Sequence, residues 1–378
     1  MSERRPLADL FGGFAQGSVP DDGAPAAAAP DPSQMSCPAP IPERARVLLG
    51  HGSGGQLSAA LMRDVIGPAL AAAAPGGPLN DAAVVDVGGQ RLAFTTDSFV
   101  VSPLEFPGGD IGELAVNGTV NDLAMMGAQP LALSLAYVIE EGLPIEDLRK
   151  VTESVARAAE RAGVRIVTGD TKVVGRGAAD GLFVNTAGIG LVAAGVTVGA
   201  DRAAVGDAVI LSGPIGLHGI AVMSIREGLG FEVEIASDTQ PLNGLVAAIV
   251  AACPDVRVLR DPTRGGLASA MNEIAAASGV GIELLEDKIP IPGPVRAACE
   301  MLGLDPLHVA NEGKLVAIVP AGAAEAVLRA MRAVAEGAAA VEIGRVVADH
   351  PAMVTVRTIV GSQRIVDMLV GEQLPRIC

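Results

Sequence analysis

The sequence predicts an α/β (α+β) protein built from two domains. Short runs of β-forming residues alternate with helical stretches along the chain, which is typical of mixed sheets covered by helices. The chain has 378 residues, 50% of them hydrophobic, so it can form two cores at about 100–200 residues per domain. A polar, turn-forming stretch over residues 199–206 marks the boundary between the two units.

We expect four segments in chain order. Residues 1–43 are rich in proline and alanine and poor in residues that pack, which predicts a disordered extension. A first domain is expected over residues 44–200 and a second over 201–350. Residues 351–378 carry two β-like runs, then a glycine, a proline and a terminal cysteine, a pattern that favours a mobile arm.

The first domain opens with a predicted hairpin. Residues 83–87 and 92–96 are rich in β-forming side chains, and Gly88-Gly89 supplies a turn between them. Apolar residues of the stretch 145–162 recur on one helical face, with Glu153 four residues before Arg157 on the other. The other elements expected here are a helix over 113–126 and strands over 165–168 and 182–192.

The second domain repeats the alternation. We expect strands over 208–211 and 314–319 and helices over 217–226, 243–252, 267–277 and 323–335.

Composition excludes several classes of function. Acidic residues number 43 against 27 basic ones, and the net charge of −16 argues against nucleic-acid binding and against docking on anionic membranes. No stretch has the pattern of a signal peptide or a membrane span. Four cysteines without a Cys-x-x-Cys pair exclude a disulfide scaffold and favour a reducing, cytoplasmic location.

Five aspartates lie where elements begin or end: Asp81, Asp97, Asp122, Asp170 and Asp261. Hard divalent cations take oxygen ligands, and Mg²⁺ uses a few carboxylates together with substrate phosphates. Each aspartate alone is equally well explained as a helix or turn cap. Their number favours a metal site, although spacing alone does not show that they converge.

Two glycine-rich turns and two isolated polar residues add further candidates. His51-Gly-Ser-Gly-Gly55 and Arg264-Gly-Gly266 offer free backbone N–H groups to phosphate, although neither is a Walker loop or a dinucleotide fingerprint. Lys172 follows Asp170 at the end of a predicted strand, and Glu312 lies just before a buried one. Surface positions explain both equally well, but both are candidates for acid–base chemistry.

Cys378 is the last residue of the chain. A terminal residue does not fill a core, and an exposed thiol is prone to oxidation, so this position needs a chemical reason. A prenylation box is excluded because it requires the cysteine four residues from the end. Cys253 and Cys299 have apolar helical surroundings and are expected to be buried.

The order of these motifs resembles the HypE family of hydrogenase maturation factors. The resemblance covers residue 45 to the C-terminus, and its most specific parts are Thr-Gly-Asp-Thr-Lys and the terminal Pro-Arg-Ile-Cys. The middle motifs are shared with a superfamily that includes aminoimidazole ribonucleotide synthetase and selenophosphate synthetase. Many members have two aspartates where this chain has Asn80-Asp81, which removes one possible metal ligand.

The resemblance implies an ATPase of two PurM-like domains that forms a homodimer through the sheets of its first domains. In such proteins a carbamoyltransferase, HypF, loads the C-terminal cysteine, and ATP-dependent dehydration yields a thiocyanate. The cyano group passes to iron on a HypC–HypD scaffold for [NiFe]-hydrogenase. The implied residues are Cys378, Glu312 and Lys172 for catalysis, Gly54, Gly55, Asn117, Asp170, Thr171 and Arg264 for ATP, and Asp81, Asp97, Asp122 and Asp261 for Mg²⁺.

Two alternatives remain at this point. A selenophosphate-synthetase-like ATPase would carry a reactive cysteine in an N-terminal loop shortly followed by lysine, whereas Cys37 is followed by Pro-Ala-Pro-Ile-Pro. A non-catalytic thiol carrier would present Cys378 to other enzymes, and the acidic and glycine motifs would then be structural.

Overall fold

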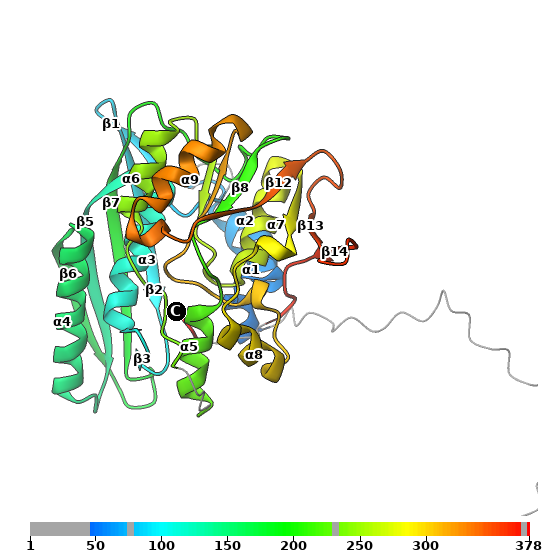
Figure 1. Cartoon of the computed structure of the whole chain (residues 1–378). Helices are drawn as coiled ribbons and strands as arrows, with labels where there is room; N and C mark the ends of the chain where they lie inside the picture. The colour runs from blue at the N-terminus through cyan, green and yellow to red at the C-terminus, as the bar shows by residue number, and fades with distance from the viewer. Residues whose placement is uncertain (1–45, 74–78, 229–233, 372–375) are drawn as a thin grey trace, which may run out of the picture. The chain divides into compact units, whose positions relative to one another are not determined.

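Two mixed β-sheets form the frame of the protein (Figure 1). The computed structural model describes residues 46–73, 79–228, 234–371 and 376–378, so the predicted extension over 1–43 lies outside the described residues. Within that part of the chain, the first sheet has five strands in the order β1 (Ala83–Val87), β2 (Gln90–Phe99), β7 (Leu182–Val192), β5 (Ala128–Glu140) and β6 (Arg165–Val174).

The predicted hairpin at the start of this sheet is confirmed. β1 and β2 pair antiparallel around Gly88 and Gly89, which have φ values of 58° and 83° that other residues rarely adopt. The interior strand β5 was not expected from sequence. Pro130 argues against a central strand, and the sheet accommodates it at a register shift between Pro130 and Ala132.

Helices α3 (Ile111–Met125) and α4 (Ile145–Ala162) pack on one face of the first sheet. Asp110 caps α3, because its carboxylate accepts hydrogen bonds from the N–H groups of Gly112 (2.8 Å) and Glu113 (3.0 Å). α4 ends at Gly163, which is left-handed with a φ of 70°. Both helices were predicted, and almost every residue of α3 is buried.

The second sheet has, among the described residues, seven strands in the order β14 (Gln363–Val366), β13 (Val354–Arg357), β10 (Gly281–Leu285), β12 (Val341–Val347), β8 (Ala208–Leu211), β11 (Val316–Val319) and β9 (Val258–Arg260). The longer helices after β7 are α5 (Leu217–Arg226), α6 (Asn243–Ala252), α7 (Gly266–Ser278), α8 (Gly293–Leu302) and α9 (Ala324–Arg332). Two short helices, α1 (Gln56–Leu61) and α2 (Gly67–Leu70), precede the first sheet.

The segment expected to be an arm from residue 351 differs from that expectation in its first half. β13 pairs parallel with β10 and antiparallel with β14, and Val354 and Val356 are fully buried. Its β-branched residues gain an apolar face by joining the sheet, so the chain leaves the sheet only after β14.

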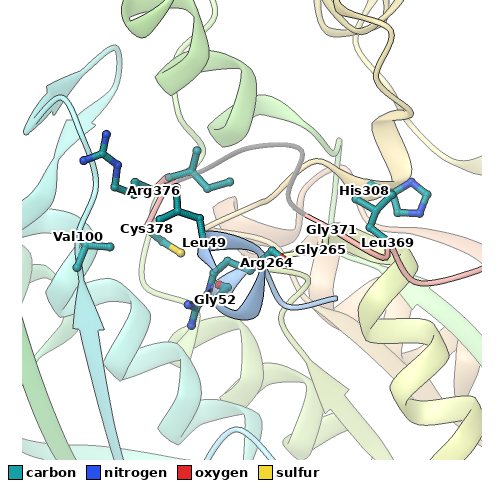
Figure 2. A pocket seen from close by; sticks show the side chains of 12 residues that line it. Leu49, Gly52, Val100, Arg264, Gly265, His308, Leu369, Gly371, Arg376 and Cys378 are labelled. Carbon is teal, nitrogen blue, oxygen red and sulfur yellow. Dashed lines mark hydrogen bonds between the residues drawn. The ribbon is translucent and has the colours of Figure 1, made fainter. Parts of the chain in front are cut away.

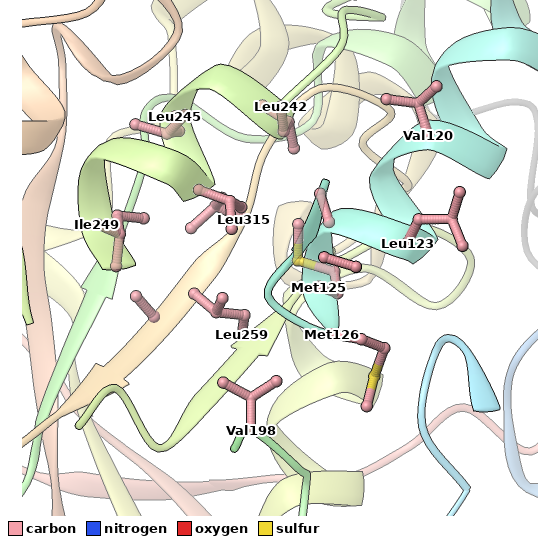
Figure 3. Packing of buried hydrophobic residues seen from close by; sticks show 14 of the residues in the cluster. Val120, Leu123, Met125, Met126, Val198, Leu242, Leu245, Ile249, Leu259 and Leu315 are labelled. Carbon is pink, nitrogen blue, oxygen red and sulfur yellow. The ribbon is translucent and has the colours of Figure 1, made fainter. Parts of the chain in front are cut away.

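One of the hydrophobic clusters spans both sheets (Figure 3). Leu123 and Met125 of α3 belong to the same buried cluster as Leu245 and Ile249 of α6, and Leu315, just before β11, continues it toward the second sheet. A continuous buried cluster resists sliding between its halves, because each side chain fills a space left by the others. The segments that come from both sheets are therefore held in fixed positions where they meet.

Candidate active site

Three carboxylates that lie far apart in the sequence meet at one point. Asp81 precedes β1, Asp122 lies in α3, and Asp261 directly follows β9. Ligand oxygens of the three side chains all lie within 4.8 Å of one another. The fold thus brings together three of the four aspartates expected to bind metal.

Arg260, the last residue of β9, is a cation beside this carboxylate group. Its Nη1 lies 2.8 Å from the carboxylate of Asp81, and its Nη2 contacts Glu273 of α7. The hydroxyl of Thr95 in β2 lies 2.9 Å from a carboxylate oxygen of Asp122 and 3.0 Å from the main-chain oxygen of Asp81. These contacts attach the group to both sheets.

Burial and neighbouring negative charges raise the pKa of each carboxyl. Burial raises the pKa of Asp81 to about 6 although Arg260 opposes it, and burial together with the charge of Asp81 raises the pKa of Asp261 to about 8. Burial and the charge of Asp261 raise the pKa of Asp122 well above its usual value. Three carboxylates this close need a compensating cation to ionise together, and Mg²⁺ prefers oxygen ligands, so the donor set fits Mg²⁺.

Asp97 lies in β2 beside the carboxylate group but outside it. Its charge helps to raise the pKa of Asp122 and of Asp261. The same charge helps to raise the pKa of Glu312 and of Cys378. Asp97 is therefore close to both the carboxylate group and the C-terminal cysteine.

The two glycine-rich turns pack against each other. Gly54 has a φ of 74°, and a Cβ atom there would lie 2.7 Å from the main-chain oxygen of Arg264. The Arg264 Nη1 donates to the carbonyl oxygen of Gly52 at 3.2 Å, and Gln56 N–H donates to the carbonyl of Leu369 at 2.8 Å. Turns that were each weak signals in the sequence form one glycine-rich surface beside Arg264.

Glu312 is buried in the loop before β11. Its N–H donates to a carboxylate oxygen of Asp238 at 3.1 Å, and Asn121 of α3 lies 3.4 Å from its carbonyl oxygen. The side-chain Oε1 is buried and has no hydrogen-bond partner among the described residues. Burial, followed by the charges of Asp261 and Asp238, raises its pKa well above the usual value. An unpartnered buried carboxyl oxygen is suited to meet a substrate atom.

The C-terminal residues dock beside the end of β2. The N–H groups of Val100 and Ser102 donate to the carbonyls of Cys378 (3.1 Å) and Arg376 (3.2 Å), which is an antiparallel pairing. The Ile377 side chain is buried in an apolar cluster that includes Val101. Burial of such a side chain contributes roughly 1.5–3 kcal/mol.

Cys378 borders a cavity of about 160 Å³. Figure 2 shows Arg264 and Val100 near its side chain, and Leu49, Gly265 and His308 also line the space. Burial raises the pKa of the Cys378 thiol well above its ordinary value, although the Arg264 guanidinium opposes this, so the docked sulfur is protonated at neutral pH.

Comparison with known proteins decides the family. Residues 79–192 and 204–357 match the N-terminal and C-terminal domains of the family described as "AIR synthase related protein". The chain is 54% identical over 328 residues to "Carbamoyl dehydratase HypE" of Azotobacter vinelandii, covering 87% of this chain and 96% of that protein. The chain belongs to the HypE family. Each domain is PurM-like, as the resemblance implied.

Solved HypE structures support the same assignment. The "Crystal structure of HypE-HypF complex" matches with a TM-score of 0.77 and 48% identity, covering 81% of this chain and 100% of that one. A HypE "in complex with ATP" matches with a TM-score of 0.74 and 46% identity, covering 88% and 100%. The Azotobacter vinelandii relative is an enzyme by name, and neither the selenophosphate-synthetase-like alternative nor the simple carrier is favoured.

Three residues that the HypE resemblance implies for ATP binding or catalysis lie away from the site at Cys378. Asp170, Thr171 and Lys172 are in the middle of β6, not at its end, and they are exposed. Lys172 Nζ pairs with the Asp170 carboxylate at 2.5 Å. β5 and β7 separate β6 from β2, which is about 14 Å at the usual strand spacing. A single chain therefore does not bring Lys172 to Cys378.

Asn117, also implied for ATP binding, is fully buried in α3. Its Nδ2 donates to the hydroxyl of Thr239 at 3.2 Å, one helical turn before Asn121. It supports the loop that precedes α6 and does not line the cavity at Cys378.

Sequence reasoning on the HypE-like motifs missed three residues near this site. Arg260 directly precedes Asp261, so its position in the motif was an available signal. His218 and Arg226 of α5 contact the C-terminal residues, but single polar residues in a helix carry no such signal. Among the described residues we also find no helix with the length and hydropathy of a membrane span.

Proposed function

We propose that the chain is an ATP-dependent carbamoyl dehydratase that acts on its own C-terminal cysteine. The observation that carries the proposal is the position of Cys378, which is close to Arg264, Glu312 and Asp97. The HypE relatives are named carbamoyl dehydratases, and one HypE structure contains ATP.

The reaction needs a better leaving group than an amide oxygen. The carbonyl oxygen of the S-carbamoyl group attacks the γ-phosphorus of ATP, and ADP leaves. The resulting O-phosphorylated intermediate loses phosphate as the C≡N bond forms, and both N–H protons leave the nitrogen. The sum is loss of one water from the carbamoyl group, coupled to hydrolysis of ATP to ADP and phosphate. Arg264 is placed to stabilise negative charge beside the sulfur.

The nucleotide would lie on the other side of the glycine-rich turns. A second cavity of about 480 Å³ is lined by Gly54, Gly55, Leu79 and Arg260 among others. Because Arg260 pairs with Asp81, phosphates entering from this cavity would reach the carboxylate group. We infer that Asp81, Asp122 and Asp261 hold Mg²⁺. The cation would neutralise phosphate charge and align the γ-phosphate for transfer.

Glu312 is the proposed base for the N–H protons, and its substitution provides the first test. In Glu312→Gln the carbamoyl group should still load on Cys378, because loading needs only the thiol. Intact mass after incubation with a HypF-type carbamoyl donor system should show one carbamoyl group gained. On addition of ATP, the wild type should lose one water and the variant should not.

A matched control uses an exposed glutamate. Glu325→Gln in α9 should behave as the wild type in both steps. Loss of water from Glu312→Gln at the wild-type rate would contradict the assignment of Glu312.

The proposed partners follow from the reaction. A HypF-type carbamoyltransferase would load the thiol, in line with the HypE–HypF complex, and a HypC–HypD complex would accept the cyano group on iron. The reaction consumes ATP and needs a reduced thiol, so we place it in the cytoplasm.

We also propose a homodimer that forms through the open face of the first sheet. Phe94 of β2 and Ile189 of β7 are direct neighbours on this face, and both are exposed. Strand register places Asp170 and Lys172 on the same face, through Ala136 and Val138 of β5. An exposed apolar face of this kind is typical of an interface. A second copy packed there would supply its Lys172 to a site that one chain leaves incomplete.

Mixed dimers provide the test of this arrangement. Lys172→Ala and Cys378→Ser chains carrying different tags are co-expressed, and the mixed species is isolated through both tags. Each homodimer should be inactive in forming the thiocyanate, because one residue type is lost from both sites. The mixed dimer has one site with Cys378 from one chain and Lys172 from the other, so it should regain about half of the wild-type turnover.

Two outcomes would contradict a homodimer in which Lys172 acts in the site of the other chain. Failure to isolate any mixed species would exclude the dimer. An inactive mixed dimer would show that Lys172 does not act across the interface.

A further inference from the structure

The C-terminal tripeptide is held by one helix of the second domain. His218 and Arg226, both in α5, contact carbonyl oxygens of the last residues, whereas the thiol of Cys378 faces Arg264. The contacts on the main chain are thus separate from the contacts on the sulfur.

His218 is fully buried and uses both ring nitrogens. Nε2 lies 2.6 Å from the carbonyl oxygen of Ile377, and Nδ1 lies 2.8 Å from the hydroxyl of Ser237. Ser237 in turn accepts a hydrogen bond from the N–H of Thr239 at 3.1 Å. The Ser237 hydroxyl hydrogen is therefore available to Nδ1, which leaves Nε2–H to donate to the tail. The Phe106 ring packs edge-on against the His218 imidazole, with 5.3 Å between the two ring centroids.

Arg226 joins the tail to the strand segment beside it. Its Nη2 donates at 2.6 Å to the carbonyl of Arg376 and at 2.6 Å to the carbonyl of Ser102, while Nε donates to Ser102 at 2.9 Å. The Arg376 side chain pairs with Asp180. The guanidinium fork thus fixes the tail relative to the segment that pairs with it.

We propose that His218 and Arg226 are positioning residues that clamp the main chain of residues 376–378 and so set the location of the Cys378 sulfur. The clamp binds main-chain carbonyl oxygens, which are the same whether the Cys378 sulfur is free, carbamoylated or cyanated. Whenever the tail docks, it therefore takes the same register in all three forms, and only the cavity at Arg264 distinguishes the group on sulfur. The inference rests on the proposed use of Cys378 as the carrier.

Alkylation of the full-length protein tests the clamp without ATP, metal or partner. Iodoacetamide labelling is followed by peptide-resolved mass spectrometry. Cys378 should react slowly in the wild type, because its thiol is only partly exposed and is protonated. His218→Leu removes the donor to Ile377 and should raise the Cys378 rate about tenfold, the factor expected for a lost buried hydrogen bond. His218→Gln retains an N–H donor and should restore most of the protection.

Cys253 and Cys299 report on the rest of the fold, since both are buried. They should stay unlabelled in every variant, and Ser224→Ala on the same helix should leave the Cys378 rate unchanged. If His218→Leu exposes Cys253 or Cys299, Arg226→Leu decides, because Arg226 lies nearer the surface. A Cys378 rate within twofold of the wild type in the folded variants would overturn the clamp.

The outcome separates this inference from the proposed function. Release of Cys378 in His218→Leu without any carbamoyl loading of the wild type would support the clamp and contradict the dehydratase. Normal loading and dehydration of the wild type, together with an unchanged Cys378 alkylation rate in His218→Leu, would support the dehydratase and contradict the clamp.

Discussion

Cys378→Ser should accept no stable carbamoyl group from the donor enzyme. Serine has nearly the same size, but its hydroxyl is a far weaker nucleophile than a thiolate. The wild type should gain one carbamoyl mass per chain, and the variant none, a loss of at least about a hundredfold in loading rate. The main-chain contacts of residues 376–378 do not involve the sulfur, so the variant should keep its docked tail and its affinity for ATP.

Peptide mapping provides the decisive control. Cys253→Ala should load as the wild type does, since the Cys253 thiol is buried and its pKa is raised by burial. A carbamoyl group found on Cys253 or Cys299, or one that persists in Cys378→Ser, would contradict the mechanism.

The docked and loading states of this cysteine have opposite requirements. A thiolate is needed to attack the carbamoyl donor, whereas the docked cavity favours the protonated thiol. A carbamoylated sulfur carries no charge, so the same cavity accepts it without the free-energy cost of burying a thiolate. Loading is therefore favoured with the tail outside the cavity and dehydration with the tail inside it.

Part of the site was predictable from its motifs, because Asp81 and Asp261 stand beside the ends of strands. Asp97 and Asp122 instead lie inside β2 and α3. Asp261 follows the short strand β9, which we did not expect from the sequence, whereas the turn at Arg264 opens helix α7, which we did. Helical periodicity also located α4 and α5 closely. These features depend on local sequence, which is where patterns of apolar and turn residues are informative.

What could not be predicted depends on contacts between distant segments. β5 contains Pro130 at an irregularity in the sheet, and only the neighbouring strands show why a proline is tolerated there. The position of Lys172 on an edge strand follows from sheet order, which local sequence does not encode. His218 is a single histidine in an apolar helix, and its role becomes visible only when the last residues of the chain lie against it.

Asp261→Asn should have opposite effects on activity and on stability. Loss of one carboxylate from the proposed Mg²⁺ site should lower ATP turnover at least about a hundredfold. Without metal, the same change removes a buried carboxyl group that must either ionise beside Asp81 and Asp122 or take up a proton on folding. The free energy of unfolding of the metal-free variant should therefore exceed that of the wild type, with a Tm higher by about 2 °C or more.

The stability difference should depend on pH in a defined direction. Burial raises the pKa of Asp261 to about 8 from an ordinary value of 3.8. A carboxyl with a raised pKa in the folded state stabilises the fold only at low pH, and that contribution is lost as pH rises through about 8. In EDTA the wild type and variant should thus melt together near about pH 4 and diverge increasingly up to about pH 9. Mg²⁺ should raise the Tm of the wild type at high pH and change that of Asp261→Asn much less.

Asp287→Asn, at an exposed pair with Lys288, is the matched control and should leave turnover and Tm unchanged. Full Mg²⁺-dependent turnover in Asp261→Asn would exclude Asp261 as a ligand. A stability difference in EDTA that shrinks as pH rises would contradict the raised pKa of Asp261.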